Sequence, residues 1–160
     1  MSGPIGRRRV VYDCNMFVQA AAFDAGPAGA CFRLIEKGSV ELFVSKPILA
    51  EVRRVLGYTD VLRISPSLTT ERIAAFVQRI TFRATLVRRV PHILDYPRDP
   101  DDEPYIDLAA AVAADYLVTR DKDLLSLMTG HSSICREFRQ KTRPLAVVDP
   151  VAFLEEVAIG

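Results

Sequence analysis

Long apolar segments, cysteine pairs and histidine clusters are all scarce in this sequence. No apolar run reaches the roughly 18 to 20 residues that span a bilayer, and no apolar segment typical of a signal peptide follows the basic N-terminal residues. The three cysteines, Cys14, Cys31 and Cys135, are widely spaced and include no CxxC pair, so neither a disulfide framework nor a cysteine zinc site is predicted. His92 and His131 are isolated in the sequence, which also argues against zinc. These absences favour a cytoplasmic protein without a membrane span.

The length and apolar content indicate a single folded domain. The chain has 160 residues and is 49% hydrophobic, which is enough to bury one core and too little for two comfortable ones. No internal repeat or low-complexity linker divides it. We therefore expect one domain over residues 1–160.

Charge is unevenly distributed along the chain. Residues 1–94 hold 14 basic and 7 acidic side chains, whereas residues 95–160 hold 7 basic and 13 acidic ones. Of the 21 basic residues, 17 are arginine, the side chain best suited to bidentate phosphate contacts. Two interpretations stay open: a polyanion-binding part beside an acidic metal site, or solvated arginines that reflect only the base composition of the genome.

Short apolar segments alternate with amphipathic ones along the chain. The pattern predicts strands over 10–12, 40–45, 116–119 and 145–148, with a short edge strand over 84–90. It predicts helices over 28–37, 46–56, 68–80 and 106–115, and a last helix capped by Asp149. The helix over 46–56 has Ser45 as its cap and Gly57 as its stop. Alternating strands and helices favour a mostly parallel sheet of about four to five strands, covered on both faces.

Four carboxylates are placed where they can meet. Asp13 and Asp121 follow two of the predicted strands, and ligands of parallel α/β sheets bind beyond the carboxyl ends of the strands. Glu51 lies on the shoulder of the buried face of helix 46–56, and Asp102 starts the alanine-rich helix. Bare carboxylates at this density repel one another, and a hard divalent cation such as Mg²⁺ or Mn²⁺ resolves the conflict. The implied chemistry is metal-assisted hydrolysis of a nucleic-acid backbone.

Each of these acids also has an ordinary structural explanation. Asp13 would serve as a helix cap, Glu51 as a surface residue with its charge in water, and Asp99, Asp101 and Asp102 as turn and cap residues near a helix dipole. Asp121 and Asp123 would form a turn, with Asp123 paired to Lys122 or Arg120. Their joint position at the predicted sheet edge is what favours a site.

Four segments occur in this order along the chain: "VVYDCN", "VSKPILAEVRRVL", "DPDDEPYIDLAAAVAADYLVTRDKDLLSL" and "VVDPVAFLEE". Together they resemble the PIN-domain family, and in particular the VapC-like toxin components of bacterial toxin-antitoxin pairs. The resemblance implies a three-layer α/β/α fold with a central, mostly parallel sheet. It also implies an Mg²⁺- or Mn²⁺-dependent endoribonuclease with RNA as substrate, an antitoxin protein as partner and a homodimer as assembly.

Carried over residue by residue, the resemblance assigns the site. It makes Asp13, Glu51, Asp102 and Asp121 the acidic quartet, with metal held by the three aspartates, Glu51 as a further ligand or water-orienting group, and Asp123 as an additional ligand. Asn15 and Thr119 become polar supports. Apart from the resemblance, we expect some of the arginines to contact phosphates, and the candidates are Arg53, Arg54, Arg88, Arg89 and Arg120. Asp101 would be a cap and Asp107 would face solvent. Glu103 departs from the family, which often has Asn there.

Two other functional classes remain as alternatives. One is a PIN-like module that binds RNA or a protein without catalysis. The other is a phosphatase of the haloacid dehalogenase type, which places an Asp after its first strand but needs a second Asp where this sequence has Asn15. A receiver domain fits less well, because the first strand ends without an acidic pair.

Overall fold

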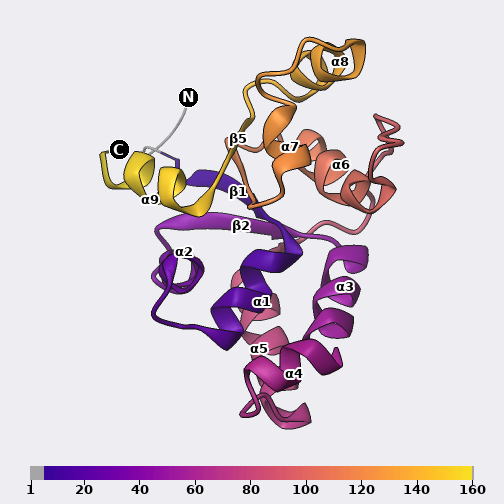
Figure 1. Cartoon of the computed structure of the whole chain (residues 1–160). Coiled ribbons are helices and arrows are strands. Elements are labelled where there is room, and N and C mark those ends of the chain that lie inside the picture. Colours follow the sequence, from indigo (N-terminus) through magenta and orange to yellow (C-terminus); the bar gives the residue numbers. More distant parts are fainter. Residues whose placement is uncertain (1–5, 160) are drawn as a thin grey trace.

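A computed structural model describes residues 6–159 of the chain. At its centre lies one five-stranded sheet with the order β3-β2-β1-β4-β5 (Figure 1). All four strand pairs are parallel. The strands are β1 (Arg8–Tyr12), β2 (Val40–Val44), β3 (Thr85–Leu86), β4 (Tyr116–Val118) and β5 (Ala146–Val148). The predicted α/β class with a parallel sheet is confirmed.

Helices cover both faces of the sheet and give three layers. One side carries α1 (Cys14–Ala22), α2 (Pro27–Glu36), α3 (Lys46–Leu56), α4 (Thr59–Ile64) and α5 (Thr70–Arg83), and the other carries α6 (Glu103–Ala111), α7 (Lys122–Ser126) and α8 (Ser133–Thr142) (Figure 1). The C-terminal helix α9 (Pro150–Ile159) packs against α2 and β4. Within residues 6–159 no helix has the length and apolarity that crossing a membrane requires.

The core is centred on β1, the middle strand. Val10 and Val11 are fully buried, as expected of a strand covered on both faces. The Tyr12 ring meets the Phe153 ring of α9 edge-on, with centroids 6.0 Å apart. Phe153 also contacts Tyr116 of β4 at 5.3 Å. This aromatic packing ties the last helix to the central strands.

Helix α3 has the predicted limits but not the predicted cap. It begins after Ser45 and ends before Gly57. The Ser45 side chain makes no capping hydrogen bond, and its buried hydroxyl has no hydrogen-bond partner among the described residues. The predicted cap at Asp149 is confirmed, since its side chain accepts from an NH of α9. Thr69 likewise accepts from an NH of α5 and caps that helix.

Several helices escaped the sequence prediction. These are α1, α4, α7 and α8. Helix α1 contains few polar residues to mark a periodicity, and α4 and α7 are only 6 and 5 residues long. Helix α8 had a readable signal, because Ser132 accepts a hydrogen bond from the Cys135 NH at 3.3 Å and caps it.

The segment between β3 and the short 3-10 helix η1 (Pro100–Asp102) has little regular structure. The predicted edge strand over 84–90 shrinks to the two residues of β3. From Val87 to Asp99 the chain is mostly irregular, and we call these residues the strap. Its buried anchors are Leu94 and Tyr96. The strap leads to the carboxyl ends of the strands and to Asp99.

Gly29 in α2 is a position where the fold excludes any side chain. A Cβ added there would lie 1.9 Å from the Asp24 carbonyl oxygen, and this backbone cannot move as a side chain does. We expect Gly29→Ala to lower the free energy of unfolding by about 1–3 kcal/mol, measured by urea denaturation. Gly57→Ala is the control, because its Cβ would meet the Arg54 carbonyl at an ordinary 3.5 Å. Equal stability of the two variants would contradict this packing.

Candidate active site

The carboxyl ends of the neighbouring strands β1 and β4 bring polar side chains together. Asp13 follows β1 and Thr119 follows β4, and the two strands pair in parallel. The Asp13 NH donates to the Val118 carbonyl at 3.0 Å, so the strand pairing extends to the aspartate. This edge is where ligands bind in parallel α/β sheets.

A chain of hydrogen bonds connects Asp13 to Asp121. The fully buried Thr119 hydroxyl donates to Oδ2 of Asp13 at 2.7 Å and accepts from the Asp121 NH at 2.9 Å. Oδ1 of Asp121 then accepts from the Asp123 NH at 2.8 Å and caps α7. Thr119 therefore orients one carboxylate and fixes the turn that carries the other.

Asp102 joins Asp121 from the start of α6. One oxygen of Asp102 lies within 4.8 Å of an oxygen of Asp99 and of one of Asp121. Asp102 is only 6% exposed, and its Oδ2 has no hydrogen-bond partner within the described residues. A buried carboxylate oxygen without a partner is costly in free energy, so this atom calls for a proton or a cation. We call Asp13, Asp99, Asp102 and Asp121 the acidic centre.

Burial and neighbouring negative charges raise the pKa values of two carboxyl groups of the acidic centre, Asp102 and Asp13. Burial raises the pKa of Asp102 to about 8, with the negative charge of Asp121 as the next contribution, followed by the charges of Asp99 and Asp13. Burial also raises the pKa of Asp13, which the Thr119 hydrogen bond partly offsets and the charges of Asp121 and Glu51 reinforce. A cation bound among these oxygens would reverse both effects.

Glu51 of α3 stands at the border of the acidic centre. Its carboxylate accepts a hydrogen bond from the Tyr105 hydroxyl of α6 and lies 3.8 Å from the Arg54 guanidinium. The negative charge of Glu51 contributes to the raised pKa of Asp13. The Glu51 oxygens are not among those clustered around Asp102. Sequence reasoning missed Tyr105, because a buried tyrosine on an apolar helix resembles an ordinary core residue.

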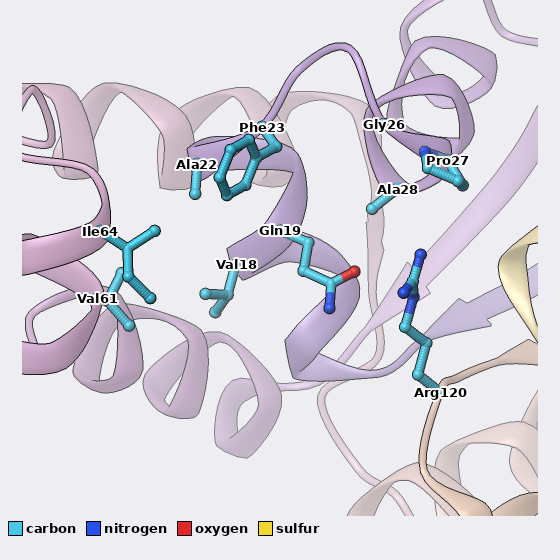
Figure 2. Close-up of a pocket in the computed structure, with 10 residues that line it drawn as sticks. All are labelled: Val18, Gln19, Ala22, Phe23, Gly26, Pro27, Ala28, Val61, Ile64 and Arg120. Atoms are coloured by element: carbon cyan, nitrogen blue, oxygen red, sulfur yellow. The ribbon is translucent and has the colours of Figure 1, made fainter.

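The remaining predicted site residues lie around this centre. Asp123 pairs with Arg98 of the strap at 3.1 Å, so its carboxylate already has a cationic partner. Asn15 is exposed on the first turn of α1. Arg120 is also exposed, and its side chain extends from the loop after Thr119 toward α1 and α2 (Figure 2).

The other candidate arginines are dispersed. Arg54 donates to the Tyr58 hydroxyl at 3.3 Å in addition to its contact with Glu51. Arg53 lies beside α5 in a shallow pocket that Phe82 also lines. The exposed Arg88 and Arg89 belong to the strap. The structure therefore brings Arg54 close to a predicted site acid through its contact with Glu51, and Arg120 adjoins Asp121 along the chain.

The structure corrects the sequence expectations for Asp107 and His92. Asp107 does not face solvent: it is buried and accepts from the Ile93 NH at 2.9 Å, while its other oxygen lies 2.7 Å from Nδ1 of His92. His92 is therefore not isolated, and its Nε2 lies 2.7 Å from Asp95. Residues distant in sequence supply these partners, which no local pattern shows.

Further contacts fix the strap to α6 and α8. The Tyr96 NH donates to Oε2 of Glu103 at 2.7 Å, and the Lys141 ammonium donates to the Ile93 carbonyl at 2.7 Å. Asp99 caps η1 by accepting from the Asp101 NH at 3.2 Å, so the predicted cap role of Asp101 was wrong. Glu103 and Asp107 thus hold the segment that delivers Asp99.

A second cluster of side chains of the types that bind metals lies where the strap meets α6. Oxygen or nitrogen atoms of His92, Asp95 and Glu103 lie within 4.8 Å of one another. The hydrogen bonds of His92 to Asp107 and of Tyr96 to Glu103 already join the strap to α6, and His92 also bonds to Asp95. A bound cation would have to break those bonds. We therefore interpret this cluster as the clamp of the strap.

The comparison with known protein families agrees with this architecture. A family model described as PIN domain matches residues 9–123, a range that contains the acidic centre and Glu51. The chain belongs to the PIN-domain family. No curated protein matches its sequence significantly. PIN domains are nuclease-type domains, so the predicted family and the general class of function are confirmed.

The raised pKa of Asp102 predicts a pH-dependent stability in protein freed of metal by EDTA. The folded pKa of about 8 lies above the unfolded value of about 3.9. The folded state therefore binds the Asp102 proton more tightly than the unfolded state, and this proton stabilises the fold fully below about pH 4. The stabilisation is lost as the pH rises toward 8. We expect Asp102→Asn to melt a few degrees above wild type at pH 8 and the difference to shrink at pH 5. Circular dichroism measures both curves, with exposed Asp101→Asn as the control. A variant less stable than wild type at pH 8 would contradict the repulsion.

The raised pKa of His92 also predicts that the stability of the protein falls as the pH rises, but over a higher pH range. Its bonds to Asp95 and then Asp107 raise its pKa to about 9, above an unfolded value of about 6.5. The stabilising effect is therefore complete below about pH 6.5 and is lost as the pH rises through about 9. Between pH 7.5 and 9.5 we expect the melting temperature to fall less in His92→Gln than in wild type, with His131→Gln behaving as wild type. Identical slopes for wild type and His92→Gln would refute the clamp.

Proposed function

We propose that this protein is a metal-dependent endoribonuclease that hydrolyses RNA phosphodiester bonds and serves as the toxin of a toxin-antitoxin pair. One observation carries the metal-dependent part. A buried carboxylate oxygen of Asp102 has no partner among the described residues and lies beside two further carboxylates. Such an arrangement favours a cation, and the PIN domain supplies the nuclease context.

The donor set fits a hard divalent cation. The acidic centre offers only carboxylate oxygens, the ligands that Mg²⁺ and Mn²⁺ prefer. Asp13, Asp102 and Asp121 would hold the ion, and Asp99 is placed to add a fourth carboxylate. A bound ion supplies activation of a water and neutralises charge on the phosphate.

The surrounding residues have distinct parts in the proposed reaction. Thr119 keeps Asp13 oriented through its 2.7 Å hydrogen bond. Glu51, fixed by the Tyr105 hydroxyl, would orient the attacking water and receive its proton. Arg120, one residue before Asp121, would contact a phosphate of the RNA strand.

The biological role and assembly are part of the same proposal. We infer a cytoplasmic protein that forms a homodimer and is inhibited by an antitoxin protein. The resemblance of four ordered segments to toxin-type PIN proteins supports this role. A neighbouring open reading frame that encodes a small DNA-binding antitoxin would support this role. Co-expression of that antitoxin tests it, because the antitoxin should neutralise the toxicity of this protein.

The catalytic proposal predicts loss of RNA cleavage when single carboxylates are neutralised. With Mg²⁺ or Mn²⁺ present, we expect Asp13→Asn and Asp121→Asn each to lower the rate of cleavage of single-stranded RNA at least about 100-fold. The reason is that each substitution removes a charged ligand while keeping the size of the side chain. A gel assay with end-labelled RNA measures the rate, and circular dichroism confirms folding.

The control and the contrary results are specific. Asp101→Asn, an exposed neighbour outside the acidic centre, should retain wild-type cleavage. RNA binding without metal-dependent cleavage on a broad RNA panel would instead support the module that binds without catalysis. Hydrolysis of phosphate monoesters in place of RNA would support the phosphatase alternative.

A further inference from the structure

An apolar groove runs between α1 and α4, and Arg120, the residue before Asp121, is part of its lining. It has a volume of about 420 Å³, within the range of small-ligand pockets. Figure 2 shows Val18 and Ala22 of α1 facing Val61 and Ile64 of α4, with Phe23 at the end of α1. Phe23 and Ile64 are 61% and 66% exposed, so these apolar side chains are available to a ligand.

Arg120 connects the groove to the acidic centre. It lines the groove and lies between Thr119, which bonds Asp13, and Asp121. No carboxylate lies within 4.0 Å of its guanidinium in the part of the chain that the structure describes, and the lining of the groove contains no acidic residue. Arg120 therefore offers the groove a cation without a carboxylate partner in the described structure, one residue before Asp121 of the acidic centre, which suits a strand carrying phosphate.

The groove also offers the two kinds of contact that unpaired bases use. The Phe23 ring is an exposed face of the type on which bases of single-stranded RNA stack. The Gln19 side chain extends into the space between Phe23 and Arg120 (Figure 2). Its amide both donates and accepts hydrogen bonds, as reading the edge of a base requires.

We propose that this groove binds one unpaired nucleobase of the RNA strand beside the scissile phosphate, with Phe23 stacking on the base, Gln19 contacting its edge and Arg120 binding the adjoining phosphate. This inference rests on the proposed function. Helix α1 rises about 1.5 Å per residue, so Gln19 and Phe23 lie roughly 9 to 15 Å along the chain from Asp13. A continuous strand can therefore occupy both places, and the groove would contribute base preference.

The test combines a protein variant with removal of a base from the RNA. Short single-stranded homo-oligoribonucleotides of each base are prepared intact and with one abasic nucleotide at successive positions. Fluorescence anisotropy measures binding in EDTA, where metal-dependent cleavage does not interfere. We expect Phe23→Ala to raise Kd roughly 5- to 100-fold, and one abasic position to weaken wild type by a similar factor while leaving Phe23→Ala unaffected.

The controls separate this subsite from the general nuclease function. Phe82→Ala removes an equally large ring that is 81% exposed on α5 and should bind as wild type does. If the effect of Phe23→Ala on Kd adds to the effect of every abasic position, the subsite is overturned, even if the wild type cleaves RNA. That result would favour a protein segment as the ligand of the groove. Coupling at one position in a protein that never cleaves RNA would support the subsite and reject the nuclease. Absence of RNA binding by the wild type would overturn both.

Discussion

Repulsion among buried carboxylates is the constraint on which the rest of this site depends. The fold places Asp13 and Asp121 at the ends of neighbouring strands and brings Asp102 to Asp121 from the start of α6. Asp102 is 6% exposed and has an unpartnered oxygen in the described structure. Such a group is tolerated only as a protonated acid or beside a cation. The raised pKa of Asp102 favours the protonated acid when no metal is bound. A bound divalent ion would favour the ionised carboxylate.

The acidic stretch that precedes and begins α6 serves more than one purpose. Asp102 belongs to the acidic centre, whereas Glu103 and Asp107 accept hydrogen bonds from the strap. The strap in turn delivers Asp99 to Asp102 and pairs Arg98 with Asp123. Neighbouring acids in the sequence therefore divide between chemistry and the support of the segment that completes the site.

The sequence was sufficient for the parallel α/β class, because alternating strand and helix patterns indicate it, and for the positions of Asp13 and Asp121 after strands β1 and β4. It was insufficient for Asp107, whose partner His92 lies 15 residues away across an irregular segment. It also could not show that Tyr105 bonds Glu51 or that Arg120 faces a groove, since both depend on contacts between elements distant in sequence. Helix α1 was missed because it has few polar residues to mark a periodicity, and α7 was missed because it has only 5 residues.

The central claim is that the acidic centre holds a divalent cation, and crystals soaked with Mn²⁺ test it most directly. The account predicts an anomalous difference peak among the carboxylates of Asp13, Asp102 and Asp121, with Oδ2 of Asp102 pointing at it, and no such peak in crystals of Asp102→Asn. A well-occupied Mn²⁺ at the strap instead, or ordered carboxylates with no peak among them at saturating Mn²⁺, would contradict the account.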